Sequence, residues 1–166
     1  MRNAVKRNFI LQQGFEEPAP SACPLQYSSL LFQPRIVFMW VVAGILFQSP
    51  AVFEVLCAVL WWSALFPKLN PFDALYNQTI GRRPGTIRLG LAPAPRRVAQ
   101  TMAGAFALTT ALLIHAGFNL GAHTVEAIFL AAVLALAFGG FCLGSFVYHL
   151  LRGHGRFARQ TLPWAS

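Results

Sequence analysis

The sequence predicts an all-α integral membrane protein, with four transmembrane helices as two hairpins and a short amphipathic interfacial helix in the central cytoplasmic loop. Of its 166 residues, 56% are hydrophobic and only 11% are charged, which is more apolar surface than a soluble domain of this size can bury. The apolar residues form long runs, and the basic residues fall in blocks between them. The net charge of +8 therefore suits a membrane surface, and no nucleic-acid partner is expected because no aromatic and basic binding platform is visible.

Residues 1–28 form a polar and basic arm that we expect in the cytoplasm. Asn8 can cap a short helix over 8–13, and Gly14 can end this helix in a left-handed conformation. Three prolines between residues 16 and 24 then favour an extended linker. The apolar side chains of the arm would lie on a membrane surface or pack under the bundle.

The membrane domain, 29–151, opens with an apolar run that predicts the first hairpin. Crossing about 30 Å of hydrocarbon takes about 20 helical residues, so this run is too long for one straight helix and suits two. The break is most natural at Gln48-Ser49-Pro50, which gives helices at about 29–47 and 51–69. We expect a kink or an irregular first turn at Pro34.

The cytoplasmic loop, 67–97, contains a signal for a short helix. Asn70 is a suitable cap, Pro71 suits the first turn, and Asp73 lies near the positive end of the helix dipole. The residues that follow at helical spacing form an apolar stripe of Phe72, Leu75, Tyr76 and Thr79. The stripe predicts an amphipathic helix lying along the membrane.

The second hairpin is predicted from helices at about 98–117 and 124–151, followed by a cytoplasmic tail, 152–166. Small residues recur every fourth position in both helices, which allows neighbouring backbones to approach closely. These helix-packing residues are Ala103, Ala107 and Ala111 in the first helix and Gly140 and Gly144 in the second.

Basic residues set the predicted orientation. All 13 Lys and Arg fall in or beside the arm, the central loop or the tail, and the turns at 48–50 and 118–123 have none. Four crossings place the three basic regions on one side, which the positive-inside rule makes the cytoplasm, with both termini there. The alternative, one kinked helix over 36–66, would split the charge between the two sides.

Two thiols are candidates for chemistry, Cys142 and Cys23, because the predicted topology puts both near the cytoplasmic side. Such a pair could cycle between dithiol and disulfide or handle sulfur. In the alternative interpretation, Cys142 is a small packing residue and Cys23 an incidental loop thiol. Cys57 lies mid-helix among apolar neighbours and is expected to pack only.

Polar side chains also gather near each predicted membrane face. Four of them lie near the outer face and could bind Zn²⁺ or relay protons, namely Glu54, His115, His123 and Glu126. The alternative is that the two glutamates favour helix N-termini through the helix dipole and that the histidines are ordinary interfacial residues. On the inner side, Arg35 could pair with Asp73, with two further polar side chains near the cytoplasmic exit, Tyr148 and His149. We expect a structural role for this inner group, and no cofactor.

Three residue runs are distinctive when taken together, namely Asn70-Pro71-Phe72-Asp73-Ala74-Leu75-Tyr76-Asn77, Pro93-Ala94-Pro95-Arg96-Arg97 with Gln100, and Phe141-Cys142-Leu143-Gly144. In these runs, and more loosely from Phe9-Ile10 and Gln12-Gln13-Gly14-Phe15 to Leu151-Arg152, the chain resembles a bacterial membrane family catalogued as domain-of-unknown-function family 4395. The resemblance implies a small multi-helix protein of the bacterial inner membrane and no established activity. It also implies that some relatives carry a second cysteine where this chain has Ser145.

Three functional hypotheses follow from these patterns. The first is a non-catalytic accessory or scaffold subunit, packing through its small faces against itself as a homo-oligomer or against a larger membrane complex, with membrane lipids around it. The second is a thiol-dependent protein of sulfur or redox handling, using Cys142 and Cys23. The third is a small-solute or ion permease that works as an oligomer. An enzyme is not expected, because no nucleotide loop, hydrolase elbow or metalloprotease motif is present.

Overall fold

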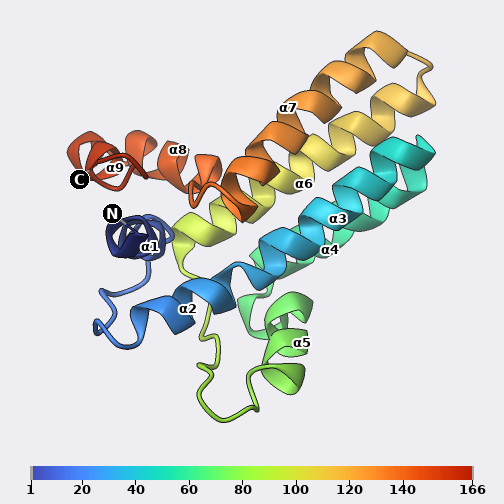
Figure 1. Ribbon diagram of the computed structural model, residues 1–166. Helices are drawn as coiled ribbons and strands as arrows, with labels where there is room; N and C mark the ends of the chain where they lie inside the picture. Colours follow the sequence, from blue (N-terminus) through green and yellow to red (C-terminus); the bar gives the residue numbers. More distant parts are fainter. Residues whose placement is uncertain (1, 166) are drawn as a thin grey trace.

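The computed structural model describes residues 2–165, with side chains from residue 4 onward, and the regular elements in this range are all helical (Figure 1). In chain order they are α1 (Arg2–Gln12), α2 (Cys23–Leu30), α3 (Phe32–Phe47), α4 (Pro50–Leu65), a 3₁₀ turn η1 (Pro67–Leu69), α5 (Pro71–Thr79), α6 (Ala94–His115), α7 (Asn119–Ala137), α8 (Leu143–Leu151) and α9 (Gly155–Gln160). The all-α prediction is confirmed for the described residues.

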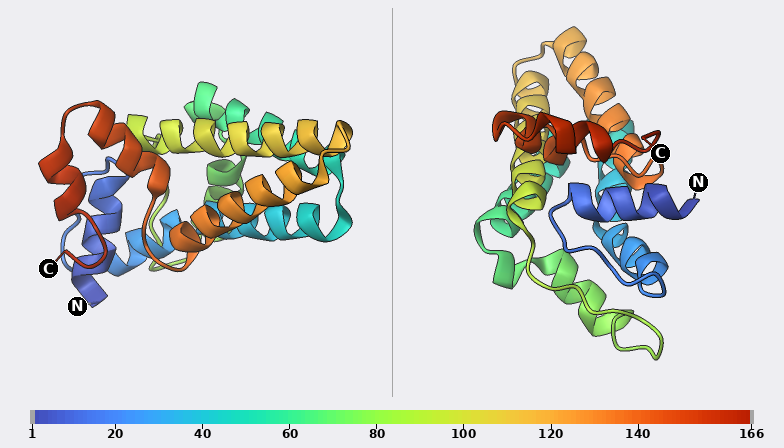
Figure 2. Two further views of the ribbon diagram at one scale, coloured as in Figure 1. Left: turned by 90° about the horizontal axis from the view of Figure 1, so that it is seen from above. Right: turned by 90° about the vertical axis from the view of Figure 1, so that its left-hand side faces the viewer.

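Four long helices, α3, α4, α6 and α7, form an antiparallel bundle of two hairpins (Figures 1 and 2). Both hairpin turns lie at one end of the bundle, which we call the hairpin end. Both termini, α1, α5, α8 and α9 lie at the opposite end, which we call the loop end. Because α4 packs along α6, α6 against α7 and α7 against α3, the helices α3 and α6 face each other across a diagonal.

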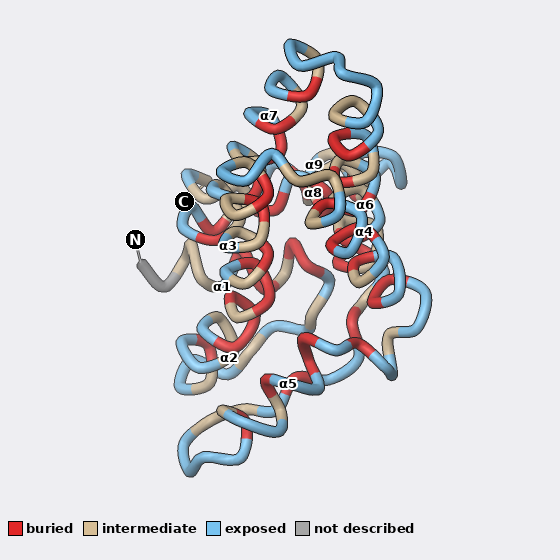
Figure 3. Tube along the Cα trace, turned by 90° about the vertical axis from the view of Figure 1, so that its right-hand side faces the viewer, coloured by how far each residue is buried: buried red, intermediate tan, exposed pale blue. Residues whose placement is uncertain are grey.

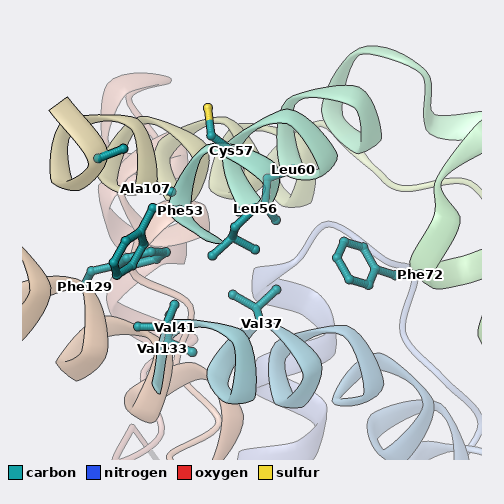
Figure 4. Close-up of a cluster of buried hydrophobic side chains, with 11 residues drawn as sticks. Val37, Val41, Phe53, Leu56, Cys57, Leu60, Phe72, Ala107, Phe129 and Val133 are labelled. Atoms are coloured by element: carbon teal, nitrogen blue, oxygen red, sulfur yellow. The ribbon is translucent and has the colours of Figure 1, made fainter. Parts of the chain in front are cut away.

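The core of the bundle is built from one buried stripe on each of the four helices. Figure 4 shows the side chains that meet there, among them Val37, Phe53, Leu56 and Phe129. The outward faces are exposed along most of their length (Figure 3), and they carry large apolar side chains such as Phe47, which is 76% exposed. Water would make this surface costly and hydrocarbon would not.

Three helical segments are long and apolar enough to cross a membrane, namely 23–47, α6 and α7. The fourth bundle helix, α4, is also apolar but has only 16 residues. At 1.5 Å per residue it is about 24 Å long, a few ångström short of the hydrocarbon core.

The first hairpin turns where the sequence predicted it. Gln48 adopts a left-handed conformation after α3, with φ 43° and ψ 43°, and Pro50 begins α4. The expected irregularity near Pro34 lies at Leu31, between α2 and α3, because proline has no N–H to donate to the carbonyl one turn earlier. The predicted helix 51–69 ends early, since the residue before Pro67 is disfavoured in helical conformation.

The predicted single helix 124–151 is wrong, because the chain breaks at residues 138–142 and makes two helices, α7 and α8. Gly140 has φ +66°, and the backbone N–H of Phe141 donates to the carbonyl of Ala135 at 3.1 Å, which closes a helix-ending turn. The helix α8 then leaves at an angle to the bundle (Figures 1 and 2). Gly140 and Gly144 are therefore not on one helical face.

The amino-terminal arm folds against the loop end. Its helix, α1, is longer than predicted, so Asn8 is an interior residue and not its cap, while Gly14 does take the predicted left-handed conformation with φ +86°. Phe9 and Ile10 are completely buried. The Asn8 amide donates to the carbonyls of Leu162 and Ala165, which brings the two ends of the chain together (Figure 1).

Candidate functional site at the loop end

The short helix α5 positions an acidic side chain under the bundle. Asn70 caps α5 by accepting from the Phe72 backbone N–H at 3.0 Å, and its amide donates to Asp73 Oδ2 at 2.9 Å. The predicted apolar stripe is divided between two environments. Phe72 and Tyr76 are buried against the protein beside Asp73, whereas Leu75 is half-exposed. The buried side of α5 is thus packed against the bundle.

Asp73 pairs with Arg96 in the first turn of α6. Arg96 Nη2 donates to Asp73 Oδ1 at 2.7 Å and Nη1 to Oδ2 at 3.2 Å, which is the two-pronged geometry that arginine favours with carboxylates. The side chains are only 5% and 10% exposed. Burial at this depth makes each charge dependent on the other, since either one alone would be desolvated without compensation.

The predicted pair between Arg35 and Asp73 is therefore wrong. Residues two apart on a helix point about 200° apart, and on α3 it is Gln33 that faces the bundle interior. Gln33 is buried, and Arg35 is exposed on the opposite side. Several arginines in the sequence could pair with Asp73, and the orientation of α3 turns Arg35 away from it.

Gln33 and Gln100 complete the cluster across the α3–α6 diagonal. Gln33 Oε1 accepts from Arg96 Nη2 at 2.8 Å and from Gln100 Nε2 at 3.0 Å. These donors fix the orientation of both amides, because turning Gln100 over would set two carbonyl oxygens against each other. As a result Gln100 Oε1 is buried with no hydrogen-bond partner. We call Gln33, Asn70, Asp73, Arg96 and Gln100 the loop-end polar cluster.

A cavity of about 60 Å³ lies beside this cluster, inside the bundle. Its polar lining consists of Gln13, Gln33, Arg96 and Gln100. Apolar side chains of α3, α4, α6 and α7 form its walls, and Cys142 also borders it. A cavity of this size has room for water or another small polar guest. The unpartnered carbonyl of Gln100 gives such a guest a place to donate a hydrogen bond.

Cys142 immediately precedes α8, and it is held by the amino-terminal arm. Its backbone N–H donates to Gln12 Oε1 at 2.8 Å, and its thiol is buried. Burial raises the pKa of the thiol, and the neighbouring groups of Ser145 and Gly144 together with the more distant charge of Arg96 lower it by less. The thiol is therefore protonated near neutral pH and hard for reagents to reach.

The second candidate thiol, Cys23, begins α2 and has different neighbours. It is buried in an apolar cluster with Phe9, Ile10 and Tyr76. The cysteines in the described part of the chain are all free, so the structure does not join Cys23 to Cys142 as a disulfide. Cys57 is buried in the core cluster of the bundle.

A second buried polar group lies between α1 and α8. His149 Nε2 donates to the backbone carbonyl of Gln12 at 2.9 Å, which leaves His149 Nδ1 as an acceptor without a partner. Gln12 Nε2 and Ser145 Oγ are also buried and unpartnered. Tyr148 packs edge-on against His149, with the Arg152 guanidinium 5.5 Å from the centre of its ring. Asp73 thus connects α5 to α6, whereas His149 connects α8 to α1.

At the hairpin end, the four predicted ligands form two separate pairs. His115 Nε2 lies 2.8 Å from Glu54 Oε1, and His123 Nδ1 lies 2.9 Å from Glu126 Oε2. Gln48 donates to both oxygens of the buried Glu126, at 3.1 and 3.2 Å. Among the residues with described placement, no three His, Cys, Asp or Glu side chains come together as a metal site.

The predicted small residues lie at close contacts within the chain. A Cβ added at Gly144 would lie 2.5 Å from the Cα of Ala99 on α6, so α8 can dock there only with glycine. Ala107 and Ala111 are fully buried in the core, and Ala103 packs against it. Gly140 lies in the turn before α8.

Sequence reasoning missed three members of the loop-end polar cluster, Gln33, Arg96 and Gln100. Each is a polar residue within or at the edge of an apolar helix, which is a signal for an interior role. It also missed Gly104, over which Trp61 packs while its indole N–H donates to the Thr101 carbonyl at 3.1 Å. A glycine inside a long helix was the available signal.

Comparison with known proteins gives the chain a family but no characterised relative. Neither a search of curated proteins nor a search of solved structures finds a match. The model of a family described as a domain of unknown function, DUF4395, matches residues 28–152, which is most of the chain and includes the whole loop-end polar cluster. This chain therefore belongs to the DUF4395 family.

Proposed function

We propose that this chain is a non-catalytic accessory or scaffold subunit of a membrane complex in the bacterial inner membrane. The observation that carries the proposal is where the polar side chains point. The Asp73–Arg96 pair, Gln33 and Gln100 bond inward and tie α3, α5 and α6 together. The outward faces of the bundle are apolar, as expected of a rigid body that meets lipid and other helices.

The charge distribution favours an orientation with both termini in the cytoplasm. All 13 Lys and Arg belong to segments at or beside the loop end. The hairpin end carries Glu54 and Glu126, each next to a histidine, and no Lys or Arg. The positive-inside rule then puts the loop end in the cytoplasm, with α4 as the short fourth crossing.

A partner helix would find its best approach on α7. The small faces of α6 and α8 are used inside the chain, but α7 also has an outward stripe of small residues. Thr124, Ala127 and Ala131 are exposed at helical spacing. Small side chains at every third or fourth position allow close helix contact in lipid, where packing and not the hydrophobic effect drives association.

Purification of the tagged full-length protein in mild detergent tests this proposal. We expect it to elute as an oligomer or with further membrane proteins, and Ala131→Leu to release them while the thermal unfolding midpoint holds. Ala105→Leu is the matched control, because Ala105 is an exposed alanine on α6. A monomer without partners, unaffected by either change, would contradict an accessory role.

A thiol-dependent function is the second candidate, and the position of Cys142 favours it. The thiol lies at the start of α8, next to Ser145, and borders the interior cavity. Two observations argue against a thiol-dependent function: the Cys142 thiol is buried, and Cys23 lies in a separate apolar cluster. Replacing both residues by serine decides the matter: an unchanged cellular phenotype of the double variant ends the thiol hypothesis. The third hypothesis, a permease, has no comparable observation in its favour.

A further inference from the structure

We propose that a groove at the loop end binds one anionic phospholipid, with its phosphate at Arg35 and an acyl chain along α3. The inference rests on the membrane placement in the proposed function but not on any partner protein. The groove has a volume of about 360 Å³, in the range of pockets that hold small molecules. It lies between α2, α3, α5 and the loop that follows α5.

Among the described residues, the Arg35 guanidinium has no carboxylate partner. The carboxylate expected to pair with it, Asp73, is taken by Arg96 on the other side of α3. Within the part of the chain that the structure describes, Arg35 takes part in no ion pair. Arg35 is exposed and lines the groove.

The position of Arg35 along its helix places its charge near the level of the lipid headgroups. It belongs to the segment 23–47, which is apolar enough to cross a membrane, and it lies in the first turn of α3. An arginine at such a depth extends its head toward the interface, where lipid phosphates lie. A phosphate diester offers two oxygens in the geometry that a guanidinium prefers.

The rest of the groove fits the apolar part of the same lipid. Met39 lies one turn beyond Arg35 on the same face of α3, in the direction of the hairpin end, and is 68% exposed. Ile36 and Phe32 line the groove beside them, and Tyr76 on α5 and Ile80 after it line the groove from another part of the chain. The groove thus runs from a cationic head to an apolar wall, which is the polarity of a phospholipid in the cytoplasmic leaflet.

The hydroxyl groups around the groove already form hydrogen bonds within the protein. Ser28 donates to the Leu25 carbonyl at 2.8 Å, and Thr86 donates to the Ile80 and Arg83 carbonyls at 3.1 and 2.7 Å. Ser29 and Tyr76 are hydrogen-bonded to each other. Arg35 is therefore the group that would select between headgroups, and it would select by charge.

The test measures lipid binding to the purified, delipidated full-length protein in an uncharged detergent, by native mass spectrometry and thermal unfolding. Phosphatidylglycerol is the anionic probe and phosphatidylcholine the zwitterionic one. We expect one phosphatidylglycerol to be retained per chain and to raise the unfolding midpoint more than phosphatidylcholine does. Arg35→Gln should weaken phosphatidylglycerol binding roughly fivefold to tenfold and phosphatidylcholine binding by less, because the choline ammonium offsets the charge of the phosphate diester that both lipids carry.

Arg83→Gln is the matched control, since Arg83 is an exposed arginine of the loop after α5 whose side chain is outside the groove. It should bind phosphatidylglycerol as the wild type does. Equal loss in both variants, or none in Arg35→Gln, overturns the proposal. Met39→Glu gives a second readout: a carboxylate there should repel the lipid, and binding at wild-type strength contradicts the acyl position.

Adding inorganic phosphate tests whether the anion bound at Arg35 is a lipid headgroup or free phosphate. If millimolar phosphate raises the unfolding midpoint as phosphatidylglycerol does, the site is a phosphate site and the lipid assignment fails. No effect of phosphate supports the lipid. Because these experiments use the isolated chain, they stand apart from the Ala131→Leu test of partner binding.

Discussion

The side chain of Gln12 accepts a 2.8 Å hydrogen bond from the backbone N–H of Cys142, which lies 130 residues later in the chain. The donor is the last residue of the break between α7 and α8, and the acceptor belongs to the amino-terminal arm. The arm thereby supplies a partner to a backbone group that the break would otherwise leave buried and unpaired.

Gln12→Leu should therefore destabilise the protein by about 1–3 kcal/mol, the cost of a buried donor left without an acceptor. The measurement is thermal or denaturant unfolding in detergent, and Gln78→Leu on the exposed side of α5 serves as the control. If both variants unfold together with the wild type, the arm does not hold the break.

Removing one member of the Asp73–Arg96 pair should cost far more than removing Arg35. Asp73→Asn leaves a buried guanidinium without its carboxylate, and such changes cost about 3–5 kcal/mol. Arg35→Gln should change stability by less than about 0.5 kcal/mol in lipid-free detergent, because the residue is exposed. A double-mutant cycle of Asp73→Asn with Arg96→Gln measures the coupling. Coupling of Asp73 to Arg35 instead would contradict the arrangement.

Gly144→Ala should push α8 away from α6. The new methyl group would meet the backbone of Ala99 at 2.5 Å, and backbone cannot turn aside as a flexible side chain can. Overpacking of this kind costs about 1–3 kcal/mol. Gly90→Ala is the matched control, since a Cβ there meets nothing within 4 Å. The two variants are compared by unfolding midpoint, and equal midpoints would show that α8 docks less closely.

Cys142 should react slowly with maleimide at neutral pH and faster as the pH rises. Burial raises its pKa above the ordinary value of 9.0, so the thiolate appears only at higher pH than in an exposed cysteine. The same shift contributes stability that is present below the ordinary pKa and is lost as the pH rises through the folded-state value. An exposed cysteine made by Ser28→Cys provides the reference rate. Equal rates at pH 7 would contradict the buried, protonated thiol.

Those parts of the fold that depend on local chemistry could be predicted from the sequence. The turn at Gln48 and Pro50 and the Asn70 cap of α5 each follow from a residue whose backbone or side chain favours one conformation. The break before α8 was missed because Gly139-Gly140 inside an apolar run reads equally well as a packing face. Only the left-handed conformation at Gly140 distinguishes the two.

The candidate site depended on the rotation of helices, which sequence spacing alone does not determine. Asp73 was recognised, but its partner was not, because Arg35 and Arg96 are equally plausible before one knows which face of α3 is buried. The pairing of Glu54 with His115 likewise depends on how α4 and α6 meet, whereas His123 and Glu126 are three residues apart on α7, a spacing that is visible in the sequence.

The hydrogen bonds from Asn8 to the carbonyls of Leu162 and Ala165 couple the two ends of the polypeptide. Because these partners are 154 and 157 residues apart in sequence, α1 completes the contacts only after the segment that contains Leu162 and Ala165 has been synthesised. Removing that segment would therefore also take two hydrogen-bond acceptors away from α1.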